Sequence, residues 1–393
     1  LLDNTCLGCA TRATTSTAAA NLAAISISGT TGGLSAGTLA GSTGVTINAV
    51  ANGTGIGFDQ GARTISSSAG GVTITVNGQT GTAYSSTGSI TATGQAISIA
   101  TTTTSVTSGT TTTSAGAGIN TTGAINGGAV TLISTLGTTS ATTTPITATG
   151  LITADSLTVT GTGGASTTIV SLGAITINLG GGNIVVTAND AAAGANTGIT
   201  QTGAITDNAV GSNISFISNN LINQTGAIAL AANTGVSAAN IIYDTTSGNN
   251  ASKITAGTIT IGTGTSSAAI NYLVKTNGAI ISVPAITVPG YILLDNTCLG
   301  CATPATAATA AVNGNAITLG GALSAGTLAG TTGITVNAVA NGSGIGVVQG
   351  ANAISSSNGG ITITVNGQTG TGYSSSGTIT ATGQAITDRK SVV

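Results

Sequence analysis

Two short cysteine motifs are the most pointed chemical features of this sequence. Cys6-Leu7-Gly8-Cys9 recurs as Cys298-Leu299-Gly300-Cys301. Two C-x-x-C pairs can build a four-cysteine zinc site when they lie close together in the chain, but the second pair here follows the first by 292 residues. A thioredoxin-like redox site would need alternating strands and helices, and the sequence lacks that alternation.

We therefore expect a small disulfide within each pair, joining Cys6 to Cys9 and Cys298 to Cys301. An extended strand would hold the two Cα atoms about 10 Å apart, beyond disulfide reach, whereas a turn brings them within about 7 Å. Gly8 and Gly300 stand where a type II turn favours positive φ. Free thiols in each pair are the alternative. A disulfide would agree with an oxidising, extracellular setting.

Acid-base catalysis has few candidate side chains, because the chain contains neither His nor Glu. The remaining acids and lysines that could serve are scattered singly along the chain: Asp3, Asp59, Asp155, Asp190, Asp207, Asp244, Asp295, Lys253 and Lys275. None forms a pair close enough in sequence to indicate a catalytic dyad. We expect no enzyme activity, no cofactor and no metal site.

A long internal duplication organises the chain that carries these residues. Leu34–Ile97 returns as Leu323–Ile386 with 51 of 64 positions identical, and the segment at Leu1 returns at Leu293. We expect residues 1–292 to form one long β-repeat unit and residues 293–387 a truncated second copy. Residues 388–393 match what a common short-read sequencing adapter encodes in one frame, so we expect them not to belong to the natural protein.

The composition favours a folded chain with an unusual surface. Charged residues make up 4% and aromatic residues 2%, while the mean hydropathy is +0.46 and the net charge is -2. Disordered chains combine low hydropathy with high net charge, so disorder is not expected. We expect no membrane-spanning segment, since no apolar run approaches eighteen residues or so, and no nucleic-acid binding, since no basic cluster precedes the last six residues.

Short strands are predicted throughout, because aliphatic residues alternate with Thr over segments such as Val72–Val76 and Ile361–Val365. Gly, a small residue and Ile recur at intervals of about 20 to 50 residues, beginning at Gly123, Gly173, Gly203, Gly226, Gly257 and Gly278. That rhythm predicts an all-β parallel β-helix, or β-solenoid, with about 20 residues per coil. Tandem immunoglobulin-like β-sandwich domains are the alternative.

Three further segments carry expectations. Thr101–Ser114 is nearly all Thr, Ser and Gly, and is expected to form a loop or a weakly packed coil. Pro284 and Pro289 flank a short strand pattern and indicate an edge or a bend. Thr73 and Thr75 have the local spacing of a Thr array that can order water and bind ice, but the array does not recur regularly in the sequence.

The chain resembles the repetitive stalks of filamentous haemagglutinin-type adhesins and related β-strand-repeat proteins of bacterial surfaces. The resemblance rests on the Gly-Ala-Ile segments, the Ile-Thr-Ala-Thr-Gly segments at Ile90, Ile146 and Ile379, and the long repeat. It implies a secreted, non-catalytic stalk at the bacterial cell surface that gives reach and attachment to a host or environmental ligand. A self-associating surface-layer protein is the main alternative, and an ice-binding solenoid is the third.

Overall fold

The computed structural model describes residues 1–5, 14, 23–27, 34–36, 44–108, 110–137, 143–164, 168–178, 182–190, 196–235, 237–249, 251–262 and 265–392. The chain divides into two compact units. Unit 1 comprises Leu1–Asn178, Val186–Ala192 and Thr200–Gly203, and unit 2 comprises Leu179–Val185, Ala193–Ile199 and Ala204–Val393. The strands β21 (Ile184–Asp190) and β22 (Thr197–Gln201) contain residues of both units.

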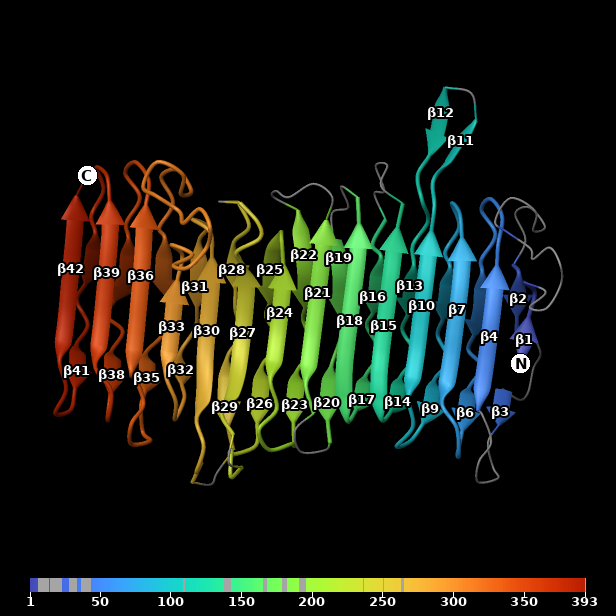
Figure 1. Ribbon diagram of the computed structural model, residues 1–393, viewed down its shortest axis with the longest axis horizontal. Coiled ribbons are helices and arrows are strands. Elements are labelled where there is room, and N and C mark those ends of the chain that lie inside the picture. Colours follow the sequence, from blue (N-terminus) through green and yellow to red (C-terminus); the bar gives the residue numbers. More distant parts are fainter. Residues whose placement is uncertain are drawn as a thin grey trace. The chain divides into compact units, whose positions relative to one another are not determined.

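Unit 1 is a parallel β-solenoid in which each coil adds one strand to each of three sheets (Figure 1). The long-strand sheet contains β1 (Leu2–Asp3), β4 (Val45–Val50), β7 (Val72–Gly78), β10 (Ile97–Thr103), β15 (Ala129–Leu136) and β18 (Ser156–Gly163). The second sheet contains β2 (Ile25–Ser26), β5 (Phe58–Gly61), β8 (Tyr84–Ser86), β13 (Ile119–Thr121), β16 (Ile146–Ala148) and β19 (Thr168–Leu172). The third sheet contains β3 (Leu34–Ala36), β6 (Ile65–Ser67), β9 (Ile90–Ala92), β14 (Ile125–Gly127), β17 (Ile152–Ala154) and β20 (Ile175–Ile177).

Unit 2 repeats this architecture. Its long-strand sheet contains β24 (Ile214–Ser218), β27 (Ala239–Thr245), β30 (Ile270–Thr276), β33 (Ile292–Asp295), β36 (Ile334–Ala340), β39 (Ile361–Gly367) and β42 (Ile386–Val392). Its second sheet contains β25 (Leu221–Gln224), β28 (Ile254–Thr255), β31 (Ile281–Val283), β34 (Ile317–Leu319), β37 (Val347–Gly350) and β40 (Tyr373–Ser375). Its third sheet contains β23 (Ile205–Asp207), β26 (Ile228–Leu230) and β29 (Ile259–Ile261), and a separate sheet contains β32 (Ile286–Thr287), β35 (Leu323–Ala325), β38 (Ile354–Ser356) and β41 (Ile379–Ala381).

The fold prediction is confirmed, and the immunoglobulin-like alternative is wrong. Successive coils pair in parallel, as at Ile47 with Ile74 and Ile74 with Ile99, whereas an immunoglobulin sandwich is built from antiparallel strands. These three Ile are completely buried. The spacing of the same three Ile along the sequence also shows that the coils here are longer than the sequence rhythm predicts.

The core is narrow and aliphatic because inward positions of each strand hold Ile, Val, Leu or Ala. A few aromatic rings stack between adjacent coils: the ring centroids of Phe58 and Tyr84 lie 5.6 Å apart, and those of Phe216 and Tyr243 lie 5.3 Å apart. These four side chains are completely buried, so each stacked pair contributes a large apolar contact between coils.

The recurrent Gly of the Gly-small-Ile segments allows close approach of neighbouring coils. A Cβ added at Gly123 would lie 1.8 Å from the carbonyl oxygen of Gly88, and one added at Gly173 would lie 2.2 Å from that of Thr149. No side chain fits at such distances, so Gly is required there. In five of the six segments the Ile that follows begins a strand of the third sheet, as Ile125 begins β14, whereas Ile280 precedes β31 of the second sheet.

Two of the segments singled out in the sequence form short strands. β32, between Pro284 and Pro289, is the edge strand of its sheet, as the prolines predict. Thr101–Ser114 is expected to form a loop or a weakly packed coil. Thr101–Thr103 instead belong to β10, and the largely exposed strands β11 (Val106–Ser108) and β12 (Thr111–Thr113) pair antiparallel in a hairpin. This hairpin projects from the edge of unit 1 (Figure 1).

Candidate functional site

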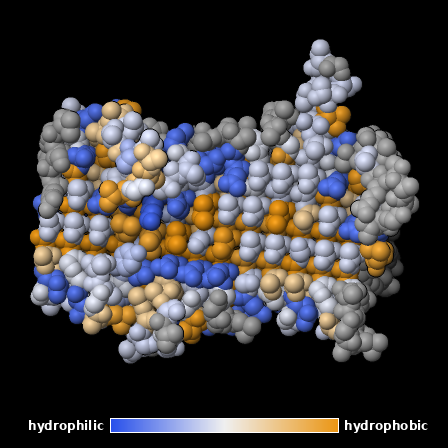
Figure 2. Space-filling view, in the orientation of Figure 1, coloured by the Kyte–Doolittle hydropathy of each residue, from blue (hydrophilic) through white to orange (hydrophobic). Residues whose placement is uncertain are grey.

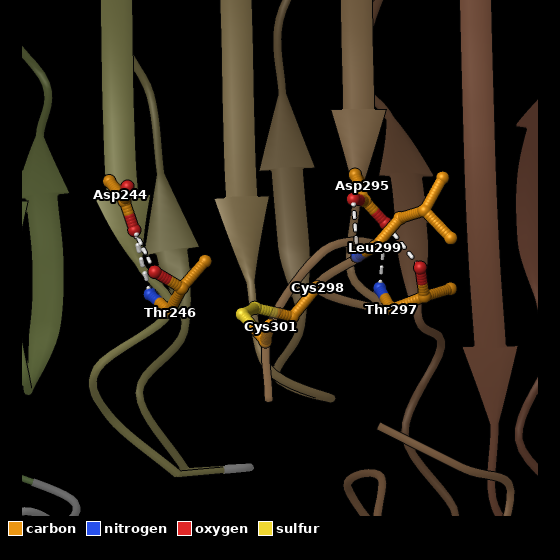
Figure 3. The surroundings of a disulfide bond; sticks show 7 residues. All are labelled: Asp244, Thr246, Asp295, Thr297, Cys298, Leu299 and Cys301. Carbon is orange, nitrogen blue, oxygen red and sulfur yellow. Dashed lines mark hydrogen bonds between the residues drawn. A yellow bond between two sulfur atoms is a disulfide. The ribbon is translucent and has the colours of Figure 1, made fainter. Parts of the chain in front are cut away.

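The described cysteines lie in the loop that follows β33. Cys298 and Cys301 form a disulfide with a Cα–Cα distance of 5.5 Å, and the Cys301 amide donates to the Cys298 carbonyl at 2.9 Å (Figure 3). The turn has a φ of 101° at Gly300. Cys298 is buried. Cys6 and Cys9 lie outside the described residues, so the disulfide expected there stays a prediction.

A carboxylate anchors the beginning of this loop. Asp295 Oδ1 accepts hydrogen bonds from the amide and the hydroxyl of Thr297 at 2.9 and 2.6 Å, and Oδ2 accepts one from the Leu299 amide at 3.0 Å (Figure 3). Asp244 accepts the same two bonds from Thr246 at 2.8 and 2.6 Å. Aspartate in this pattern forms an Asx turn, which ends the strand and starts the loop.

Three of the charged residues that are scattered in the sequence come together on one surface of unit 2. Asp244 of β27 is in register with Lys275 of β30, and Lys275 is in register with Asp295 of β33. These residues are far apart in the sequence, and they become neighbours because parallel coils place residues from successive turns of the chain on adjacent strands. The alternation of each strand, with Asp and Lys at outward positions, is the signal that could have indicated it.

The other acids lie apart on separate coils. Asp3 is on β1, Asp59 is on β5 and Asp155 precedes β18. Asp207 of β23 is buried, and it accepts hydrogen bonds from the Ala209 amide at 2.9 Å and the Ser212 hydroxyl at 3.3 Å. Burial raises the pKa of this carboxyl to about 6, against the lowering effect of those two bonds.

The described residues contain no group of three or more His, Cys, Asp or Glu that could hold a metal ion. A groove of about 580 Å³ lies in unit 2 beside β29 and β32, where one sheet ends and the other begins. Its lining includes Ile261, Val288 and Leu328 and contains no charged side chain. The groove offers apolar contact and hydroxyl groups but no acid or base.

The most regular surface is the outward face of the long-strand sheet in unit 1, which we call the threonine face. One column of hydroxyl residues crosses five adjacent strands without a break: Thr46, Thr73, Ser98, Thr131 and Thr158. A second column contains Asn48, Thr75, Ala100, Ile133 and Thr160, and a third contains Asn77, Thr102, Thr135 and Thr162. All of these residues are exposed or half-buried.

The threonine face is a two-dimensional array. Neighbouring strands lie about 4.8 Å apart, and outward positions along one strand repeat about every 6.6 Å. Figure 2 shows the array as rows of pale side chains over β7, β10, β15 and β18. Its one large apolar member is Ile133, which is 39% exposed.

Thr-x-Thr does not recur on every coil, as the sequence indicates, because Ala100 and Ile133 stand in the second column, but the first column is unbroken across five strands. Members of the first column are unequally spaced along the chain, and the interval from Ser98 to Thr131 is the longest, so no fixed period appears in the sequence. That interval contains the β11–β12 hairpin, which loops out and leaves the register of the sheet intact. Structural regularity is thus hidden by unequal loops.

No helix in the described part of the chain has the length and hydropathy needed to cross a membrane. Comparisons of the chain with protein-family models, with curated proteins and with solved structures found no match. The structure itself therefore carries the classification: the chain is a β-helix repeat protein.

Proposed function

We propose that this chain is a non-catalytic structural segment of a secreted bacterial cell-surface adhesin, in which stacked coils supply reach and attachment to a host or environmental surface. The observation that supports it most is that the duplicated segments repeat the same bonds between coils. Asn4 accepts from the Val50 amide at 2.7 Å and donates to the Val50 carbonyl at 3.0 Å. Asn296 forms the same pair of bonds with Val339 at 2.7 and 3.0 Å.

Shared bonding between the copies means that the chain can lengthen by duplication without a new kind of interface. Each solenoid coil contacts only its neighbours, so added coils extend a repeat protein at little cost to its fold. The resemblance to haemagglutinin-type stalks supports an extracellular location and an adhesive role. A surface-layer component, assembled into a lattice, is the alternative within the same structural class.

Electron microscopy of the purified chain beside a version with one extra copy of residues 1–292 tests this proposal. We expect thin single particles that lengthen by about 50 Å per added copy, at about 4.8 Å per coil. Ordered two-dimensional sheets would favour the surface-layer alternative. Particles that do not lengthen with the added copy would contradict a role in reach.

The threonine face supports a second candidate function, which is binding to ice. Its first column presents a hydroxyl on five successive strands, and none of the members of the face is charged. A neutral hydroxyl array can hold water in a regular pattern, whereas a charged side chain would impose its own hydration shell. The methyl groups of Thr add apolar surface between the hydroxyls.

Thermal hysteresis and ice-recrystallisation assays test the second candidate. We expect activity in the unaltered protein and its loss in Thr131→Lys, which places a charge within the first column. Thr153→Lys is the matched control, since Thr153 is a half-buried residue of β17 in the third sheet. An unaltered protein without hysteresis, or equal activity in both variants, would rule out ice binding by this face.

A further inference from the structure

The outward residues of β27 and β30 in unit 2 form a patch that is complementary to itself. On β27 these residues are Asn240, Ile242 and Asp244, and on β30 they are Asn271, Leu273 and Lys275. The register pairs them as Asn with Asn, Ile with Leu, and Asp with Lys. We call these six residues the β27–β30 patch.

The patch has an apolar character that the threonine face lacks. Figure 2 shows hydrophobic side chains on the outward surface over β24, β27 and β30, where the threonine face has hydroxyls. Ile217 of β24, next to the patch, is 37% exposed, and Ile242 is half-buried. Leu273 is 9% exposed, so the two Ile side chains offer most of the apolar contact to a partner.

The charged ends of the patch are available to that partner. Asp244 and Lys275 are in register in a chain of which only 4% is charged, whereas Asp295 on the next strand is 3% exposed and is held by its own loop. Lys275 is half-buried, and its ammonium forms no ion pair or hydrogen bond with any residue in the described ranges. Asp244 is also half-buried, and the bonds from Thr246 both go to Oδ1. A charge that lies at an aliphatic surface without a partner gains most when a second surface brings the opposite charge.

A two-fold axis parallel to the strands and midway between β27 and β30 brings the two charged members and Ile242 of the patch against a second copy. Rotation by half a turn about that axis lays β30 of one copy over β27 of the other and keeps the position along the strand. Asp244 then faces Lys275 of the second copy, and Ile242 lies over Leu273. Asn271 is 6% exposed and already donates to Asn240 of its own chain at 3.0 Å, so the Asn pair adds no contact. Self-complementarity of this form, in which residue i meets j and j meets i, defines an isologous interface.

We propose that the β27–β30 patch is a homodimer interface, through which a second copy of this chain packs face to face. The occupant is a second copy because the two-fold rotation exchanges β27 and β30, which places the acid of one copy opposite the lysine of the other and an aliphatic residue opposite an aliphatic residue. An unrelated partner would need to fit only one of the two strands, so it would leave the complementarity between β27 and β30 unexplained. The inference does not depend on the adhesive function, and it predicts lateral pairing of chains in either structural setting.

Charge reversal separates this interface from other modes of association. Lys275→Asp makes Asp244 face another carboxylate, and Asp244→Lys makes Lys275 face another ammonium. We expect each variant alone to dimerise at least about tenfold more weakly than the unaltered chain in sedimentation velocity at low salt. Lys253→Asp is the control, since Lys253 is exposed and precedes β28 outside the patch.

Mixing the two charge-reversal variants tests whether dimerisation depends on the contact between positions 244 and 275. A heterodimer of Lys275→Asp with Asp244→Lys places opposite charges at both contacts, so an equimolar mixture should recover dimers. The double variant should also dimerise with itself. Circular dichroism of each variant checks that the solenoid is folded. A monomeric unaltered chain, an undiminished Lys275→Asp dimer, or a mixture of folded variants that stays monomeric would overturn the proposal.

Discussion

The hydroxyl of Tyr243 donates a buried hydrogen bond to Oε1 of Gln224 at 2.8 Å, while the neighbouring Tyr272, whose ring centroid lies 5.8 Å away, buries its hydroxyl without a partner among the described residues. The paired arrangement recurs in unit 1, where Tyr84 donates to Gln60 at 2.6 Å. A buried Gln thus joins one coil to the next at a corner of the solenoid. Burial raises the pKa of Tyr243 and of Tyr272, so both stay protonated in neutral solution.

The neighbouring Tyr243 and Tyr272, whose rings are tilted by 60° to each other, should respond oppositely to loss of the hydroxyl. Tyr243→Phe leaves Gln224 Oε1 with one fewer donor in a buried site and should lower the free energy of unfolding by about 1 to 3 kcal/mol. Tyr272→Phe removes an unpartnered buried hydroxyl and should be neutral or stabilising. Urea denaturation of both variants measures the difference. Equal losses would show that Tyr272 has a partner in solution.

Asp207 should make unit 2 more stable in mildly acidic solution. Burial raises the pKa of Asp207 from its usual 3.8 to about 6, so the folded chain binds a proton more tightly than the unfolded chain. The resulting stability is fully present below pH 3.8 and is lost as the pH rises through about 6. With allowance for solvent screening, the effect is at most about 2 kcal/mol.

Asp207→Asn tests this dependence, because Asn keeps the acceptor for the Ala209 amide and cannot ionise. The variant should exceed the unaltered chain in unfolding free energy at pH 7 and match it near pH 4. Comparing the two proteins at both pH values cancels the contributions of the other carboxyls. A difference that does not change between the two pH values would contradict the raised pKa.

Gly123→Ala should be strongly destabilising. The added Cβ would lie 1.8 Å from the Gly88 carbonyl oxygen, so adjacent coils would have to separate. Overpacking of this kind costs about 1 to 3 kcal/mol or more. Gly367→Ala is the control, because a Cβ at Gly367 meets no heavy atom within 4 Å. Thermal melting should separate the variants clearly, and similar melting temperatures would show that the coils can move apart cheaply.

Thiol labelling tests the cysteine pairs. Without reductant, iodoacetamide should modify neither Cys298 nor Cys301, and after reduction it should modify both. A disulfide that closes a four-residue loop removes little conformational entropy from the unfolded chain. Cys298→Ser should therefore lower the free energy of unfolding by no more than about 2 kcal/mol. Mass spectrometry of the peptide that contains Cys6 and Cys9 answers the same question for the first pair. Labelling without reductant would establish free thiols.

Much of the fold could be predicted from the sequence because its strands show the two-residue alternation of apolar and polar side chains that is typical of a β-strand. Alternation of aliphatic residues with Thr at Val72–Val76 and Ile361–Val365 predicts strands there, and β7 and β39 confirm both. Low aromatic content together with recurrent Gly-small-Ile segments favours stacked coils over sandwiches, since a narrow core needs no large side chains. These are local properties of the sequence, so the strand predictions do not depend on the lengths of the loops between the strands.

The sequence is less informative where residues from different coils meet. Asn126-Gly127 reads as a turn, yet it lies inside β14, where pairing with the neighbouring coils outweighs the turn preference of Asn-Gly. In β42, Asp388 is in register with Ile363, at the position that Ile99 takes beside Ile74 in the first copy. The sequence of β42 therefore departs from the repeat at a position that is apolar in the first copy.

By itself, then, the sequence determined that this protein is a duplicated, parallel β-solenoid of low charge, because strand periodicity and composition are written residue by residue. Only the tertiary structure decided which side chains share a surface. Ser98 lies between Thr73 and Thr131 in one column of hydroxyls, and Lys275 lies between Asp244 and Asp295. Pairing between coils sets this register while the loops between strands differ in length, so no period in the sequence reports it.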